Sequence, residues 1–298
     1  MNQPLLNSRS NAPRMVVSTH DRSIGKILMD AGRLKQENAE RIARFQKERG
    51  VRFGEAALKL RLLSKQDIQF ALARQFEYPY LEKQDGDFSK ELVAAYEPFS
   101  PQSEALRSLR NQLLLRKFSV EYKTRVVISP ERGEGRSYVA ANLAVAFAQL
   151  GGNTLLIDAD LRNPRQHNIF NLNNGIGLST VLSGRMGAET IQNVPFFMNL
   201  SVLTAGPIPP NPLELLSRAA FGQLMHELSN HYDAILIDTP AGEYNADAQA
   251  IMAQAAAAYA TALVVVRKNT THLARAKNFL KRIRAANVEV AGAVFNQF

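Results

Sequence analysis

Residues 126–137 read Val-Val-Ile-Ser-Pro-Glu-Arg-Gly-Glu-Gly-Arg-Ser, an apolar run that passes directly into a turn containing two glycines. The segment that follows, residues 136–150, has the composition of a buried helix. A glycine-rich turn between a strand and a helix points backbone N–H groups inward, and the helix N-terminus adds its dipole, so the turn can bind phosphate. The predicted nucleotide-binding residues are Gly133, Glu134, Gly135, Arg136, Ser137 and Tyr138.

This turn departs from the general P-loop pattern at two positions. Pro130 stands where the first glycine is usual, and Arg136 stands where a lysine is usual. Arginine is bulkier and forked, whereas lysine delivers a compact charge between phosphates. Ser137 keeps the hydroxyl that ligates Mg²⁺ in such loops. Nucleotide binding is therefore a safer prediction than catalytic turnover.

Carboxylates stand at the ends of two further apolar runs. One run ends in Asp158, with Asp160 two residues later, and another ends in Asp238. If the first strand continues to Asp160, its alternation places both acids on one side. The carboxyl ends of parallel strands share the sheet edge at which the phosphate loop lies. We therefore expect the three acids to converge on one nucleotide–metal site, where the metal ligands are Ser137, Asp158 and Asp238.

Apolar strands alternate with helical segments from about residue 125 to the end of the chain. This alternation predicts an α/β fold with a mainly parallel sheet and helices on both faces, preceded by a small all-α domain. The predicted strands span residues 125–129, 154–158, 200–204, 234–238, 260–266 and 288–294. The predicted helices between them span residues 136–150, 212–231, 245–257 and 271–286.

The front of the chain has a different organisation. A helical pattern repeats after 29 residues within the segment 21–82, so that Ile24 and Gly25 correspond to Phe53 and Gly54. In the second copy, Ser64 begins a predicted helix with a capping box. The predicted divisions are a disordered leader at 1–20, a helical domain at 21–82, a polar linker at 83–99 and a nucleotide-binding domain at 100–298.

Composition limits the classes of function. The chain has 298 residues, a formal charge of +9 and no cysteine, which excludes disulfides and thiolate metal sites. The basic surplus lies mostly in residues 1–125, so it does not indicate nucleic acid for the whole chain. No apolar run reaches the roughly 18 residues of a membrane span. We expect a soluble, cytoplasmic protein that a partner recruits to the inner membrane.

The phosphate loop and four other segments together resemble the bacterial tyrosine kinases, in particular chain length determinant protein tyrosine kinases of the Eps type. This resemblance covers about residues 100–296. It implies MgATP binding, a tyrosine kinase activity in which the three acids and Arg136 are catalytic, and control of exopolysaccharide polymerisation and export through a membrane chain-length (Wzz-like) partner. The segments are residues 126–137, 158–164, 237–240, 206–216 and 103–110.

The last of these segments is similar to the element that joins subunits into rings in that family. It carries Glu104, Arg107 and Arg110, which a helix would place on one face, opposite its leucines. The resemblance therefore implies a homo-oligomer. The family usually ends in a tyrosine-rich tail, whereas this chain ends after its last predicted strand, so we expect weak autophosphorylation there.

Two other functions compete with the kinase. One is a nucleotide-dependent regulatory module with little turnover that acts through oligomerisation. The other is a partition ATPase of the MinD/ParA type, which the absence of an early lysine at Pro130 and Glu131 disfavours.

The helical segment 21–82 resembles the N-terminal domain of type II secretion and pilus assembly ATPases, some of which bind cyclic di-GMP. Arg52 and Gly54 lie at a turn where a guanidinium and a close backbone approach could bind a cyclic dinucleotide. The alternative is a basic docking domain for a partner or for the inner membrane surface.

Overall fold

The chain forms two compact units, Met1–Tyr78 and Pro79–Phe298. The structure is a computed structural model that describes residues 23–76, 78, 81, 87–115, 123–242, 246–256, 259–285 and 288–297. The predicted leader, residues 1–20, lies outside the described residues.

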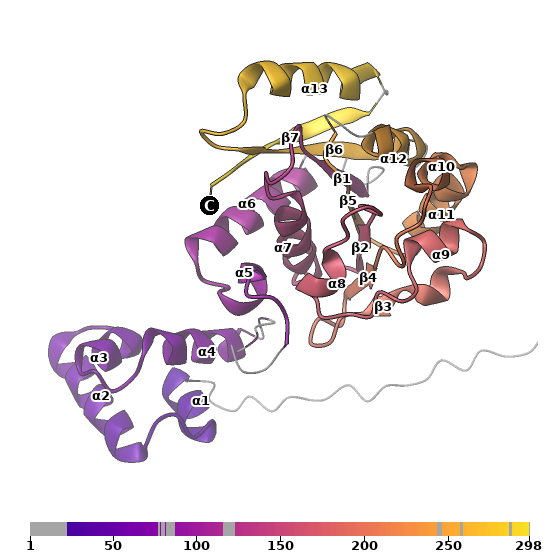
Figure 1. The fold of residues 1–298 in the computed structure, drawn as a ribbon. Helices are drawn as coiled ribbons and strands as arrows, with labels where there is room; N and C mark the ends of the chain where they lie inside the picture. Colours follow the sequence, from indigo (N-terminus) through magenta and orange to yellow (C-terminus); the bar gives the residue numbers. More distant parts are fainter. Residues whose placement is uncertain are drawn as a thin grey trace, which may run out of the picture. The chain divides into compact units, whose positions relative to one another are not determined.

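A seven-stranded sheet forms the centre of the second unit (Figure 1). The strand order is β3-β4-β2-β5-β1-β6-β7, and the pairings are parallel except that of β3 with β4. This arrangement confirms the predicted α/β class. The strands are β1 (Thr124–Ile128), β2 (Thr154–Asp158), β3 (Gln192–Asn193), β4 (Leu200–Leu203), β5 (Ala234–Asp238), β6 (Thr261–Arg267) and β7 (Glu289–Asn296).

Helices cover both faces of this sheet (Figure 1). They are α5 (Val93–Tyr96), α6 (Pro101–Leu115), α7 (Arg136–Ala148), α8 (Gln166–Ile169), α9 (Leu178–Leu182), the 3₁₀ turn η1 (Ala188–Thr190), α10 (Pro212–Ser217), α11 (Ala219–Ser229), α12 (Ala246–Ala256) and α13 (Leu273–Ala285). One apolar core joins the sheet to α5 through α8, and the other joins it to α9 through α13. Strands β1, β2 and β5 are buried along their whole length, as parallel strands between two helical layers must be.

The structure differs from the sequence prediction in the shorter elements. The predicted helix 212–231 is two helices, because Arg218 adopts an extended conformation (φ −70°, ψ 146°) between α10 and α11. The sequence did not predict α8, α9 or β3, which are too short to show a hydrophobic period.

The described part of the expected linker, residues 87–99, packs into the second unit. Leu92 is fully buried, and the backbone N–H of Ala94 donates to Asn142 Oδ1 at 2.9 Å. The Asn142 amide in turn donates to the carbonyl oxygen of Glu91 at 2.8 Å. A single buried asparagine on α7 thus fixes this segment against the nucleotide-binding unit.

The first unit contains two copies of one helix pair. Its helices are α1 (Ile24–Asp30), α2 (Gln36–Arg49), α3 (Phe53–Lys59) and α4 (Lys65–Gln75). Helices α1 and α3 both have seven residues and begin 29 residues apart, which confirms the predicted repeat. The turns that follow them share a left-handed residue, Gly32 (φ 68°) in the first copy and Arg61 (φ 53°) in the second. The capping box is also present, since Asp67 N–H donates to Ser64 Oγ at 3.2 Å and Ser64 N–H to Asp67 Oδ2 at 2.9 Å.

Substitutions at the left-handed residue of the two turns should change the free energy of unfolding in opposite directions. A side chain at a left-handed position costs about 1–2 kcal/mol, so Gly32→Ala should lower the free energy of unfolding by about 1 kcal/mol. Arg61→Gly should raise it by roughly 0.5 kcal/mol, because relief of strain exceeds the extra entropy of glycine in the unfolded chain. Urea unfolding of the full chain, followed by circular dichroism, measures both changes.

Ala43→Gly, at an exposed position inside α2, is the control for the effect of glycine alone. It should lower the free energy of unfolding by about 0.5–1 kcal/mol. A loss of stability in Arg61→Gly equal to that in Ala43→Gly would contradict the equivalence of the two turns.

Candidate nucleotide site

The phosphate loop joins β1 to α7 and has a defined shape. Gly133 (φ 79°) and Gly135 (φ 90°) are both left-handed, a conformation that glycine adopts without strain. The buried Glu134 side chain accepts from the backbone N–H of Glu131 at 2.8 Å and from the hydroxyl of Thr271, which precedes α13. The loop is therefore held both by its own carboxylate and by the turn after β6.

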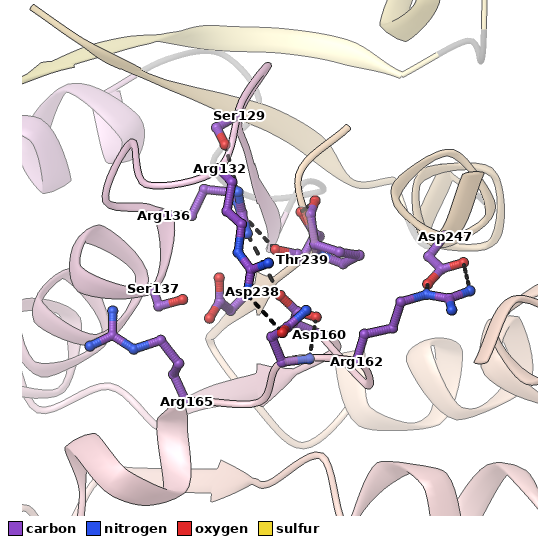
Figure 2. Close-up of polar contacts among 12 residues, drawn as sticks. Ser129, Arg132, Arg136, Ser137, Asp160, Arg162, Arg165, Asp238, Thr239 and Asp247 are labelled. Atoms are coloured by element: carbon purple, nitrogen blue, oxygen red, sulfur yellow. Dashed lines mark hydrogen bonds and ion pairs between the residues drawn. The ribbon is translucent and has the colours of Figure 1, made fainter. Parts of the chain in front are cut away.

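Arg136, in place of the usual lysine, is buried and turned toward the protein (Figure 2). Its guanidinium donates to the carbonyl oxygen of Thr239 at 2.6 Å and to Ser129 Oγ at 2.6 Å. One guanidinium nitrogen lies 3.7 Å from Asp160 Oδ2. Arg136 thus connects the phosphate loop to the ends of β5 and β2. Ser129 and Thr239 were not among the predicted site residues, although Ser129 ends one predicted strand and Thr239 directly follows another.

Asp158 and Asp238 are paired residues on adjacent strands, and both are fully buried. Asp158 Oδ2 accepts from the backbone N–H groups of Arg165 and Gln166, each at 2.9 Å. Asp238 Oδ2 accepts from Gln166 Nε2 at 2.7 Å, while its Oδ1 has no hydrogen-bond partner within the described residues. Convergence of these two acids, which topology predicted, is thus observed.

Burial raises the pKa of both carboxyls. The pKa of Asp158 lies well above its ordinary value because of burial and because the Asp238 carboxylate is close. Burial raises the pKa of Asp238 as well, although Arg136, the hydroxyl of Ser137 and the amide of Gln166 oppose that rise. The site therefore concentrates negative charge that its own hydrogen bonds do not fully balance.

Asp160 reaches the site by a route that differs from the expected one. Strand β2 ends at Asp158, so strand alternation does not orient Asp160. A turn orients it instead: its backbone N–H donates to Asp158 Oδ1 at 3.3 Å, and its Oδ1 accepts from the N–H of Asn163 at 2.9 Å. The carboxylate then faces Arg136 (Figure 2).

The donor set fits Mg²⁺. Asp238 Oδ1 is a buried acceptor without a described partner, and the Ser137 side chain lies beside Asp238 (Figure 2). No group of three or more His, Cys, Asp or Glu side chains within the described ranges could hold a metal ion. Mg²⁺ commonly takes one or two carboxylates and completes its shell with phosphate and water. Ser137, Asp158 and Asp238 could supply that limited set.

Two more arginines of the loop after β2 make ion pairs. Arg162 donates to both carboxylate oxygens of Asp247, at 2.7 and 3.2 Å, and Asp247 is buried in the first turn of α12 (Figure 2). Arg165 donates to the carboxylate of Glu91 at 2.8 Å. Asp247 was not among the predicted site residues, because its only signal in the sequence is a carboxylate at the start of a predicted apolar helix.

A groove with a volume of about 1050 Å³ opens beside the phosphate loop. Gly133, Gly135 and Tyr138 line it on the loop side, and residues of α6 and the end of β7 line it on the other. Asn296 at that end donates to the carbonyl oxygen of Glu134 at 3.1 Å. Three of the six predicted nucleotide-binding residues, Gly133, Gly135 and Tyr138, therefore border a cavity large enough for more than phosphate.

The three charged residues of α6 do not share one exposed face. Glu104 and Arg107 pair with each other at 2.6 Å near the surface, but Arg110 is buried and donates to the carbonyl oxygen of Ala146 at 2.7 Å. Arg110 therefore lies with Leu106 and Leu113 on the buried side of the helix, because it is only 40° from Leu106 at 100° per residue. The expected face, with all three charges opposite the leucines, is wrong for Arg110.

Arg52 and Gly54 lie at the start of α3 in the first unit. Arg52 is exposed, whereas a Cβ atom at Gly54 would approach the side chain of Ile68 to 3.3 Å. Gly54 therefore serves close packing of α3 against α4. Gly25, its equivalent in the first copy, has the same relation to the ring of Phe53, at 3.2 Å.

Within the described part of the chain, no helix has the length and apolar character that a membrane span requires. A family model for ParA proteins, described as NUBPL iron-transfer P-loop NTPase, matches residues 121–297 and does not reach the first unit. The resemblance of residues 21–82 to secretion ATPases thus remains a prediction.

Sequence and structure comparisons agree on the relatives of this chain. The tyrosine-protein kinase YwqD of Bacillus subtilis is 37% identical over 70% of this chain and 86% of that protein. The chimerical protein CapA2B2 is 33% identical, with a TM-score of 0.63 over 76% of this chain and 96% of that chain. The kinase domain of the Escherichia coli tyrosine kinase ETK is 31% identical, with a TM-score of 0.65 over 69% of this chain and 79% of that chain. The chain therefore belongs to the ParA-type P-loop NTPases and, within them, to the bacterial tyrosine kinase family.

Proposed function

We propose that this protein is a cytoplasmic, ATP-dependent protein tyrosine kinase that regulates exopolysaccharide or capsule polymerisation, chain length and export. A membrane chain-length determinant would recruit it to the inner membrane. The single observation that carries this proposal is the pair of buried carboxylates, Asp158 and Asp238, at the sheet edge next to a phosphate loop. The kinase relatives of the chain supply the class of reaction.

The residues of the site divide the work by their chemistry. Ser137, Asp158 and Asp238 would hold Mg²⁺, which supplies charge that neutralises the phosphates of ATP. Arg136 lies between Asp160 and the carbonyl oxygen of Thr239, where its fixed positive charge offsets the acids. Asp160 lies just past the end of β2 and keeps a small exposed fraction (7%), whereas Asp158 and Asp238 have none, so it is the acid best suited to accept the proton of a tyrosine hydroxyl.

The groove beside the loop is the proposed nucleoside site. It starts at Gly133 and Gly135 and contains apolar side chains of α6, including Leu106 and Leu109, together with Asn296. Apolar surface with a few polar groups is typical of small-molecule pockets. Phosphates at the loop and a base in this groove would account for the glycine-rich end of the groove and for its apolar lining.

Binding of ATP should depend on Mg²⁺ and on Ser137 and Asp238, two of its three proposed ligands. Ser137→Ala and Asp238→Asn should each weaken MgATP binding roughly 10- to 100-fold, because each removes a charge-assisted contact. Calorimetric titration with and without Mg²⁺ measures this change. Ser183→Ala, which removes an exposed hydroxyl after α9, should bind as the wild type does. Unchanged affinity in both site variants would contradict the site.

Kinase activity is tested with the cytoplasmic tail of the cognate chain-length determinant. Labelled ATP should transfer phosphate to tyrosine in the mixture, and Asp160→Asn should lower the rate by roughly 100-fold or more, since it removes the proposed base. Normal MgATP binding without any tyrosine label would contradict the kinase. That result would favour the alternative, a nucleotide-dependent regulatory module with little turnover.

Self-association through α6 is also proposed, with a narrower set of residues. Arg107→Glu should dissociate an oligomer formed in MgATP, because it opposes like charges at the Glu104–Arg107 surface. Arg110→Glu should instead destabilise the fold, since it would place a carboxylate beside the buried carbonyl oxygen of Ala146. Sedimentation velocity and thermal unfolding separate these effects. Lys277→Glu on the exposed side of α13 is the charge-reversal control. A wild-type monomer in MgATP and partner would contradict the proposal.

For the first unit we propose a docking role, for the partner or the membrane surface, in preference to a cyclic di-GMP site. Gly54 is occupied by packing against Ile68, which leaves Arg52 as the exposed residue of the suggested pair. Lysine and arginine outnumber acids by 12 to 6 in residues 23–76, which suits an acidic or anionic surface.

A further inference from the structure

Arg132 at the tip of the phosphate loop differs from the other arginines of the site. Its side chain is exposed, and it forms no salt bridge with any described residue. Its one side-chain hydrogen bond goes to a neutral acceptor, Asn163 Oδ1, at 2.7 Å. Arg162 and Arg165 are each paired with a carboxylate. Arg132 therefore carries a positive charge that no described carboxylate neutralises.

The position of this charge is defined by the loop after β2. Asn163 accepts from Arg132 through its side chain, and through its backbone N–H it donates to Asp160 Oδ1 at 2.9 Å. Figure 2 shows the Arg132 side chain extending from the phosphate loop past Arg136 toward Asp160. The guanidinium of Arg132 thus lies between the phosphate loop and Asp160, the proposed base.

The hydrogen bonds of Arg136 limit its ability to contact the terminal phosphate. Its Nε and one Nη are held by the carbonyl oxygen of Thr239 and by Ser129 Oγ, both at 2.6 Å. A lysine at this position would present a point charge free to lie between phosphates. Because these two hydrogen bonds hold Arg136, we expect another positively charged side chain of the protein to contact the terminal phosphate.

We infer that Arg132 binds the terminal phosphate of ATP from within the same chain. The inference rests on the proposed function and adds a residue to it. In the transfer, the bond from the γ-phosphorus to the ADP oxygen breaks, a bond to the tyrosine oxygen forms, and the hydroxyl proton passes to Asp160. Arg132 makes and breaks no bond; its planar fork donates to the γ-phosphate oxygens, on which negative charge collects.

The test compares ATP with ADP, because only ATP has the terminal phosphate. Calorimetry should show that Arg132→Gln weakens MgATP binding about tenfold, or 1.4 kcal/mol, and changes MgADP affinity less than about twofold. Arg132→Lys should give an intermediate loss for MgATP, since it keeps the charge without the fork. Arg185→Gln, the same change at an exposed position after α9, should leave both affinities unchanged.

Two failures can be told apart. A wild-type chain that binds neither nucleotide contradicts the proposed function. A wild-type chain that binds both, together with an Arg132→Gln variant that loses neither or loses both equally, contradicts only the role of Arg132. The melting temperature of Arg132→Gln without nucleotide should equal that of the wild type; a lower value would overturn the inference in favour of a structural role for the Arg132–Asn163 contact.

Discussion

The burial of two carboxylates side by side is the constraint around which the nucleotide-binding unit is organised. Asp158 and Asp238 are paired across adjacent strands with no exposed surface. An uncompensated buried ion costs several kcal/mol. The protein supplies two backbone N–H groups to Asp158 and one amide to Asp238, with Arg136 close to the second acid. One oxygen of Asp238 still has no described partner. We interpret this incomplete compensation as room for a cation.

One residue on α8 connects the parts that must agree in position. Gln166 donates through its backbone to Asp158, and its amide donates to Asp238 at 2.7 Å and to the carbonyl oxygen of Ser137 at 3.2 Å. The loop between β2 and α8 also contacts α12, because Arg162 in this loop donates to Asp247. The loop after β2 is therefore in contact with the phosphate loop, the end of β5 and the far helical layer. Displacement of this loop would alter all three at once.

The long elements and the acid cluster could be predicted, because each depends on one strong signal. Apolar runs place β2 and β5 at the predicted residues, and parallel topology then brings Asp158 and Asp238 together. The burial of Arg110 and the packing of residues 87–99 were not predicted, because both depend on contacts with residues distant in the sequence. Burial of Arg110 depends on the carbonyl oxygen of Ala146, and the fixed position of residues 87–99 depends on Asn142. Periodicity describes one segment at a time, so it cannot reveal such partners.

The arginine at position 136 also fits the charge of the acid cluster. A lysine with so little exposure can lose its proton, since burial lowers its pKa, whereas arginine stays charged. Burial and the Asp238 carboxylate raise the pKa of Asp158, and burial raises that of Asp238. The Arg136 guanidinium therefore opposes the rise in the pKa of Asp238. The same fork that secures this charge is bound to Thr239 and Ser129. Arg136 therefore cannot both stabilise the acid cluster and remain free to bind phosphate. In our proposal, Arg132 of the same loop binds the phosphate instead.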